Sequence, residues 1–244
     1  MSARKGPAIL AALALTFLGV ARLNTQQPAE HHHHPPAAAD DPDKKVEQGA
    51  VHSMMPGHHH DGPHIKLTAP RPQTPEDLAR ADAVVKTLRA ALEKYRDYRV
   101  ALADGYRPFL PNIPQPQYHF TNYRNGFLEA FTFDPAQPTS LLYKKTRDSY
   151  ELIGAMYTMP KRATEDQLNE RVPLSVARWH LHTNLCLPPK EQRGRADWTK
   201  FGLRGPISTP EACAEAGGRF LHVIFGWMVH VYPFESSREK IWGP

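Results

Sequence analysis

Cysteine is scarce in this chain: Cys186 and Cys213 are the only two among 244 residues. Two thiols cannot build the framework of a disulfide-rich mini-protein, and they cannot form a four-thiolate zinc site. Long apolar runs are also missing. The charge-free stretch from Pro7 to Ala21 has 15 residues, fewer than the roughly 20 that a membrane-spanning helix needs.

Several functional signatures are absent as well. The sequence has no Walker loop, no Rossmann glycine run and no G-x-S-x-G elbow, so nucleotide binding and α/β-hydrolase chemistry have no support. The 30 Lys and Arg residues outnumber the 25 Asp and Glu residues, giving a formal net charge of +5. These cations are spread out, whereas a nucleic-acid groove needs a basic cluster interleaved with aromatics. We therefore expect no nucleic-acid partner.

The N-terminus has the pattern of a secretory signal. Two positive charges in MSARKG precede the apolar run, and Gly19 and Ala21 are small residues of the kind found at a cleavage site. This pattern predicts a signal peptide over residues 1–21 and a periplasmic or secreted mature protein. The alternative is an uncleaved segment that anchors the protein to the membrane.

Export changes the interpretation of the two cysteines. In an oxidising compartment a pair of cysteines is more often bridged than free, which predicts a Cys186–Cys213 disulfide. The rival interpretation makes Cys186 a thiolate metal ligand, because it lies four residues after His182.

Proline and histidine are abundant, with 24 and 14 residues. Residues 22–73 contain many of both and few large apolar side chains, so we expect a disordered tail that cannot offset the entropy of ordering. Imidazoles and thioethers in this tail predict a weak scavenging site for copper or zinc. Its candidate ligands are Met54, Met55, His58, His59, His60 and His64. A solvated linker without a metal role is the alternative.

Residues 74–244 are predicted to form a single α+β domain. Thr74 and Pro75 are typical of a helix start, and apolar residues then recur every three or four positions over 75–103. Alternating patterns predict strands at 117–122, 126–132, 140–144, 150–158, 175–184 and 219–232, and short helices fit 165–170 and 209–216. This order favours an antiparallel β-sheet or small barrel with one long N-terminal helix packed against it.

Histidines in the predicted strands are the main chemical signal. His180 and His182 are two residues apart, so both side chains leave the same face of a strand, with Cα atoms roughly 6.6 Å apart. Such a pair is able to share one metal ion. His119 and His230 lie in other predicted strands and complete the candidate site, with His230 preferred to His222. The alternative is paired histidines that bind nothing.

The order of the motifs ALADGY, YHFTN, DPAQPTSLLY, ELIGAMY, RWHLHTNLC and GWMVHVYPF resembles a group of exported bacterial proteins without an assigned activity. The resemblance covers the chain from about Thr74 to its end. It implies a stand-alone exported domain with a histidine site at His119, His180, His182 and His230. The H-x-H pair is also similar to that of cupin barrels, although Cys186 stands four residues after His182 where a Glu would be expected.

These observations predict an exported metal-binding protein whose ion is most plausibly copper or zinc, with a histidine site in the fold and a His/Met-rich tail. One alternative is a metal-dependent enzyme, an oxidase, dioxygenase or hydrolase, with an open position on the metal and an acid or base at Glu129, Glu151 or Tyr232. Another is a structural or interaction domain that binds no metal.

Overall fold

The structure, a computed structural model, describes residues 62–109, 111, 115–197, 199–202 and 205–243. Contacts between residues group the chain into two units, residues 1–39 and residues 40–244. All the helices and strands described below belong to the second unit. The predicted signal peptide and the tail positions Met54, Met55 and His58 to His60 lie outside the described residues. Among the residues that are described, no helix is long and apolar enough to cross a membrane.

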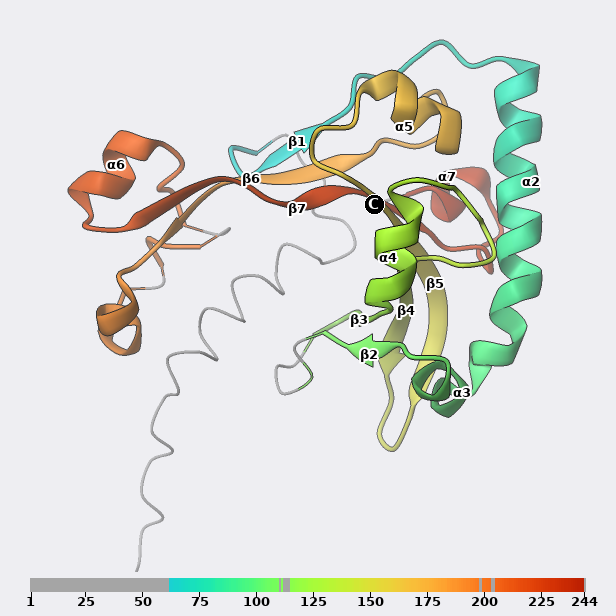
Figure 1. Ribbon diagram of the computed structural model, residues 1–244, viewed down its shortest axis with the longest axis horizontal. Coiled ribbons are helices and arrows are strands. Elements are labelled where there is room, and N and C mark those ends of the chain that lie inside the picture. Colours follow the sequence, from blue (N-terminus) through green and yellow to red (C-terminus); the bar gives the residue numbers. More distant parts are fainter. Residues whose placement is uncertain (1–61, 110, 112–114, 198, 203–204, 244) are drawn as a thin grey trace, which may run out of the picture. The chain divides into compact units, whose positions relative to one another are not determined.

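One antiparallel sheet organises the domain (Figure 1). Its seven strands have the order β1-β6-β7-β5-β4-β3-β2. They are β1 (Ile65–Leu67), β2 (Arg107–Pro108), β3 (Tyr118–Thr121), β4 (Ser140–Lys145), β5 (Tyr150–Met159), β6 (His180–Leu187) and β7 (Arg219–Val231). The predicted α+β class is confirmed, and the strand order shows an open sheet with β1 and β2 at its edges, not a small barrel.

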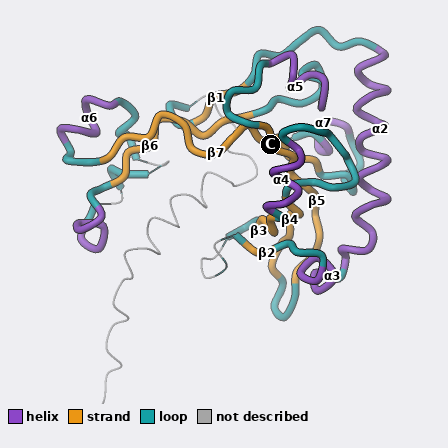
Figure 2. Tube along the Cα trace, viewed as in Figure 1, coloured by secondary structure: helices purple, strands orange, loops and turns teal. Residues whose placement is uncertain are grey.

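The main hydrophobic core lies between one face of the sheet and helix α2 (Pro75–Leu92). The Thr74 side chain accepts a hydrogen bond from the Asp77 backbone N–H at 3.1 Å, which caps the first turn. The apolar stripe of α2 then buries Ala81, Val84, Val85, Leu88 and Leu92. Figure 2 shows this helix as the longest continuous helical segment of the described chain.

The helix predicted over 75–103 is broken into three pieces. After α2 the chain forms a 3-10 turn, η1 (Glu93–Arg96), and then a short helix, α3 (Tyr98–Ala103). Asp97 has extended backbone angles between them, and its side chain accepts from the Arg99 N–H to cap α3. An Asp that caps a new helix explains the break, because its carboxylate competes for backbone donors.

The strand predicted at 126–132 is wrong. Those residues lie largely in helix α4 (Tyr123–Glu129), which begins where the Asn122 side chain accepts from the Asn125 backbone N–H at 3.1 Å. The alternation of apolar residues in this segment resembled a strand, but a good N-cap immediately before it determines a helix.

The strand predicted at 175–184 starts late, at His180. The Pro173 carbonyl accepts from the N–H groups of both Val176 and Ala177, which makes a turn of the preceding residues. Short helices α5 (Glu165–Arg171) and α6 (Pro210–Glu215) lie where the sequence predicts them. A 3-10 helix, η2 (Lys190–Arg195), and a last helix, α7 (Arg238–Ile241), were not predicted.

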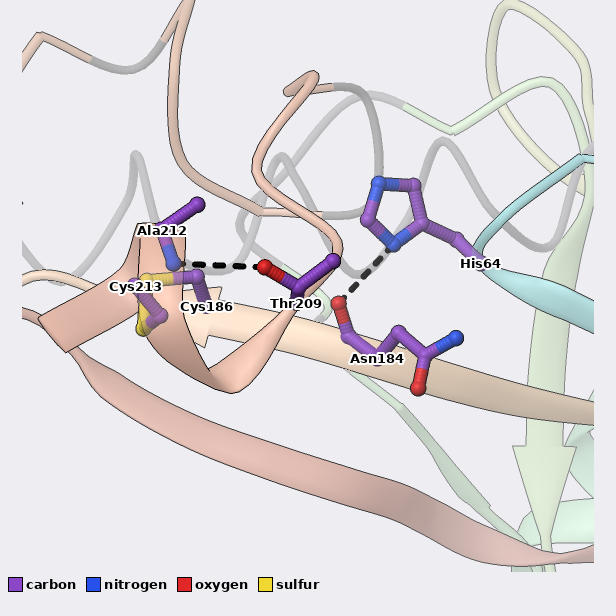
Figure 3. The surroundings of a disulfide bond; sticks show 6 residues. All are labelled: His64, Asn184, Cys186, Thr209, Ala212 and Cys213. Atoms are coloured by element: carbon purple, nitrogen blue, oxygen red, sulfur yellow. Dashed lines mark hydrogen bonds between the residues drawn. A yellow bond between two sulfur atoms is a disulfide. The ribbon is translucent and has the colours of Figure 1, made fainter.

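The fold begins before the predicted boundary at residue 74. Strand β1 pairs with β6, placing Ile65 opposite His182 and Leu67 opposite His180. His64 is buried, and its Nδ1 and Nε2 lie 3.0 and 2.7 Å from the carbonyl oxygens of Asn184 and Gly205 (Figure 3). His64 is therefore held in the fold by two backbone carbonyl oxygens and does not belong to the disordered tail in which the sequence placed it.

Cys186 and Cys213 form a disulfide with their Cα atoms 5.6 Å apart (Figure 3). This bond excludes the alternative in which the Cys186 thiolate is a metal ligand. The bond joins the end of β6 to α6. In this region β6 and β7 pair only with each other, because β1 and β5 pair with other parts of these two strands. Only a small cluster around Phe201 and the two sulfurs is buried there, and an isolated two-stranded ribbon is marginally stable.

We expect the double variant Cys186→Ala/Cys213→Ala to loosen this end of the ribbon. Closing a loop across a sequence separation of 27 residues contributes about 3 kcal/mol in the chain-entropy description. Amide hydrogen exchange should accelerate in the segment 186–220 and stay slow in the β4–β5 hairpin. Unchanged exchange in both segments would contradict a stabilising role for the bond.

Candidate functional site

The second face of the sheet, opposite α2, carries the four histidines of the predicted site, and we call it the histidine face. Side chains alternate along each strand, so Tyr118, Phe120, Trp179 and Leu181 enter the main core while the histidines between them point to the other side. The same alternation places Val229 and Val231 in the core and His230 on the histidine face.

The four rings come together although they belong to three strands. The Nε2 atoms of His119 and His230 are 3.4 Å apart. The His230 ring centroid lies 5.3 Å from that of His180, which is 5.4 Å from that of His182. The sequence-predicted set is therefore one cluster of neighbouring rings.

Contact between His119 and His230 requires a curved sheet. Strands β5 and β4 lie between β7 and β3, so the two histidines are separated by three strand spacings, roughly 14 Å on a flat sheet. Two imidazoles cannot span that distance across a flat sheet and still approach within hydrogen-bonding distance, as these two rings do at 3.4 Å. The sheet therefore bends toward the histidine face, which becomes its concave side.

The cluster is removed from water. None of the four histidines exposes more than 6% of its surface. Burial lowers the pKa of His119 to about 4, and the nearby His182 lowers it further in the same direction. The His119 ring is therefore neutral at pH 7. Its Nδ1 is buried and has no hydrogen-bond partner among the residues that the structure describes, and such a group carries a desolvation cost.

Two thioethers are close to the imidazoles. The strand register places Met156 directly opposite His230, and Met228 directly opposite His180. Residues directly opposite in an antiparallel pair share a face of the sheet. Met156 and Met228 are buried in a small cluster with Leu142 and Tyr232, so sulfur atoms and imidazoles occupy the same concave surface.

A bulge in β7 shapes this surface. Between His180 and His182 the register with β7 shifts, so that Phe225 and Gly226 are extra residues on β7. A side chain at Gly226 would collide with the Met159 carbonyl oxygen of β5. Gly226 therefore marks both a bulge and a close approach, because only glycine lets the two backbones come this close.

Two cavities border the cluster. One, of about 200 Å³, has His119, Met156 and Met228 in its wall. The other, of about 350 Å³, has His180, His230 and Trp242 in its wall, with Arg178 and Glu239 also lining it. The wall of the larger cavity also includes Val229 and Trp242, which belong to the main core.

Glu129 is a buried carboxyl close to the smaller cavity. Its Oε2 accepts from the Thr139 hydroxyl, and from the N–H and hydroxyl of Thr158 at 3.0 and 3.3 Å. Both threonines line that cavity. Burial raises the pKa of Glu129 to about 8, against the lowering effect of these hydrogen bonds, and Oε1 has no hydrogen-bond partner in the described part of the chain.

The other predicted acid or base residues are placed differently. Glu151 is exposed on β5. Tyr232 is buried with its ring 6.3 Å from that of His230, but its hydroxyl donates to Gln117 Oε1 at 2.9 Å, and burial raises its pKa to about 12. His222 is exposed on the two-stranded part of β7, away from the cluster. Glu129 is the carboxyl with an unusual environment.

Comparisons with protein-family models, curated proteins and solved structures return no match for this chain. Within the described residues, no three His, Cys, Asp or Glu side chains are already arranged as a metal site. The chemistry of the site therefore has to be argued from the histidine face itself.

Glu129→Gln tests the buried carboxyl through the pH dependence of stability. The folded protein retains the Glu129 proton up to about pH 8, whereas the ordinary pKa of a glutamate carboxyl is 4.5, so the contribution of this group to stability is full below pH 4.5 and falls as the pH rises toward 8. The slope is about 1.4 kcal/mol per pH unit. Because glutamine cannot release this proton, the variant should match wild type at pH 4.5 and be more stable by about 4 kcal/mol at pH 8.5.

Denaturant unfolding at both pH values measures this difference. Glu151→Gln is the matched control, since it removes an exposed carboxyl from the same sheet and should leave the pH profile unchanged. If the difference in stability between Glu129→Gln and wild type is the same at both pH values, Glu129 is ionised in the folded protein.

Proposed function

We propose that this protein is an exported metal-binding protein whose site is formed by His119, His180, His182 and His230 and whose ion is copper or zinc. The observation that supports this proposal most directly is the separation between the Nε2 atoms of His119 and His230, 3.4 Å. The two rings make a hydrogen bond at this distance, which is longer than the usual 2.7–3.2 Å. Two nitrogens that bind one tetrahedral zinc ion at about 2.0–2.1 Å are roughly 3.3 Å apart.

The type of donor supports a borderline or soft ion. Neutral imidazoles suit zinc and copper, and thioethers such as those of Met156 and Met228 favour Cu(I). Calcium and magnesium need several oxygen ligands, most often carboxylates, whereas the hydroxyls of Thr121, Ser140 and Thr158 on the histidine face are already paired with each other or with Glu129. A bound ion would also offset the cost of burying polar rings.

A complete site requires a small rearrangement. His119 and His230 supply two nitrogens, and His180, whose ring is beside that of His230, is the nearest source of a third. Turning a ring about its terminal side-chain bond is a soft motion. The metal-bound form therefore needs no change in strand order or register.

Export is supported by the disulfide. Structural disulfides persist in oxidising compartments such as the periplasm and the extracellular space, and the Cys186–Cys213 bond joins two elements of the fold. Together with the signal pattern over residues 1–21, this bond favours a periplasmic or secreted protein that captures metal with its His/Met-rich tail and holds it in the sheet.

A metal-dependent enzyme is the second candidate. The observation that favours it is the pair of cavities that border the histidines, one of which contacts His119 and the other His180 and His230. A catalytic site needs an open position on the metal for water or substrate, and a cavity beside a ligand provides room for it.

Elemental analysis of the purified mature protein, after exposure to copper or zinc and removal of loosely bound ions, tests the proposal. We expect about one ion per chain in the wild type. The variant His119→Gln/His230→Gln should retain less than a tenth of this amount, because it removes both nitrogens of the closest pair.

Two controls separate the fold from the tail. The exposed His222→Gln should retain the full amount, and so should the tail variant His58→Gln/His59→Gln/His60→Gln. Circular dichroism shows whether each variant is folded. If metal is lost from the tail variant and retained by His119→Gln/His230→Gln, the tail is the binding site and the histidine face is not.

A further inference from the structure

The apolar cavity beside His119 has the dimensions of a small-ligand site. Its volume is about 200 Å³, and its wall includes three aromatic rings, Phe109, Tyr123 and Phe225, and the thioethers of Met156 and Met228. An engineered apolar cavity of about 150 Å³ in another protein binds benzene. The volume here accommodates one aromatic ring with a small substituent.

The threonine hydroxyls of this cavity are already paired. Thr139 and Thr158 contribute to its wall, but their hydroxyls lie 2.8 Å from each other and both contact Glu129 Oε2. The Thr121 hydroxyl lies 2.9 Å from that of Ser140. A ligand with a charged group would lose its hydration without gaining a new partner from these threonines, so this part of the wall favours an uncharged molecule.

Phe225 adds an independent observation. Its φ angle is 65°, in the left-handed region that a bulky residue rarely adopts. The bulge at Phe225 and Gly226 directs this ring to the cavity, where it meets Phe109 edge to face with centroids 6.2 Å apart. Phe225 remains 46% exposed. Backbone strain that holds an apolar ring partly in water is a feature of binding sites more than of cores.

The aromatic and sulfur character of the wall narrows the class of ligand. Aromatic rings pack favourably edge to face, and methionine sulfur packs favourably at the edge of an aromatic ring. We infer that this cavity binds an uncharged single-ring aromatic molecule, held by Phe109, Phe225, Met156 and Met228. The inference goes beyond metal binding, since none of these contacts requires an ion, and it places the bound ring next to His119.

Calorimetric titration of the full mature protein with toluene tests this site. The titration is made on chelator-treated protein and repeated after zinc is added. We expect saturable binding of about one toluene per chain in both forms. Benzoate should bind at least tenfold more weakly because its carboxylate must be desolvated, and methylcyclohexane at least threefold more weakly because it lacks the aromatic ring.

Phe225→Ala should weaken toluene binding at least fivefold by removing one wall of the cavity. Phe127→Ala is the matched control: Phe127 is an exposed aromatic residue on α4 that is not part of the cavity wall, with 67% of its surface exposed, and its loss should change the affinity less than twofold. Both substitutions remove exposed rings, so thermal melting should show folded variants.

The outcomes distinguish this site from the metal site. Toluene binding by chelator-treated protein supports the cavity even where no metal is retained. Metal retention without toluene binding overturns the cavity alone. Equal affinities for toluene and methylcyclohexane, or weakening by Phe127→Ala in place of Phe225→Ala, would also overturn it.

Discussion

The pairing of β7 with β5 on one side and β6 on the other is the constraint on which the rest of the structure depends. It places β7 in the middle of the sheet, where alternate side chains must enter different environments. Trp227, Val229 and Val231 enter the main core. Met228 and His230, between them, are forced onto the opposite face, next to the histidines of β6 and, through the curvature of the sheet, of β3.

The two faces of this sheet have different physical character. The core face is covered by α2 and is built mainly from aromatic and aliphatic side chains, whose burial is favourable. The histidine face is equally buried but contains polar rings, and nearby Glu129 is a buried carboxyl. Burying such groups opposes folding unless they gain partners. Their presence together on one side of one sheet is the reason for assigning function to that side.

Much of the local structure could be predicted because its causes are local. The helix start at Thr74 and Pro75 and the strands β3, β4, β5 and β7 follow from capping and alternation within a few residues. The errors have equally specific causes. The Asn122 cap made α4 from residues that alternate like a strand, and His64 with β1 joined the fold by pairing with β6, over 110 residues away. Pairing between distant strands leaves no signal in a segment as short as Ile65–Leu67.

The sequence by itself determined that His180 and His182 share a face, that His119 and His230 alternate with apolar neighbours, and that only Cys186 and Cys213 were available for a disulfide. Each of these conclusions depends on residue identity and spacing alone. Only the tertiary structure decided that the four histidines meet, because contact between His119 and His230 depends on strand order and on the curvature of a sheet with two strands between them. It also decided that Glu129 is buried and that Phe225 and Gly226 form a bulge, since both result from packing between segments far apart in the chain.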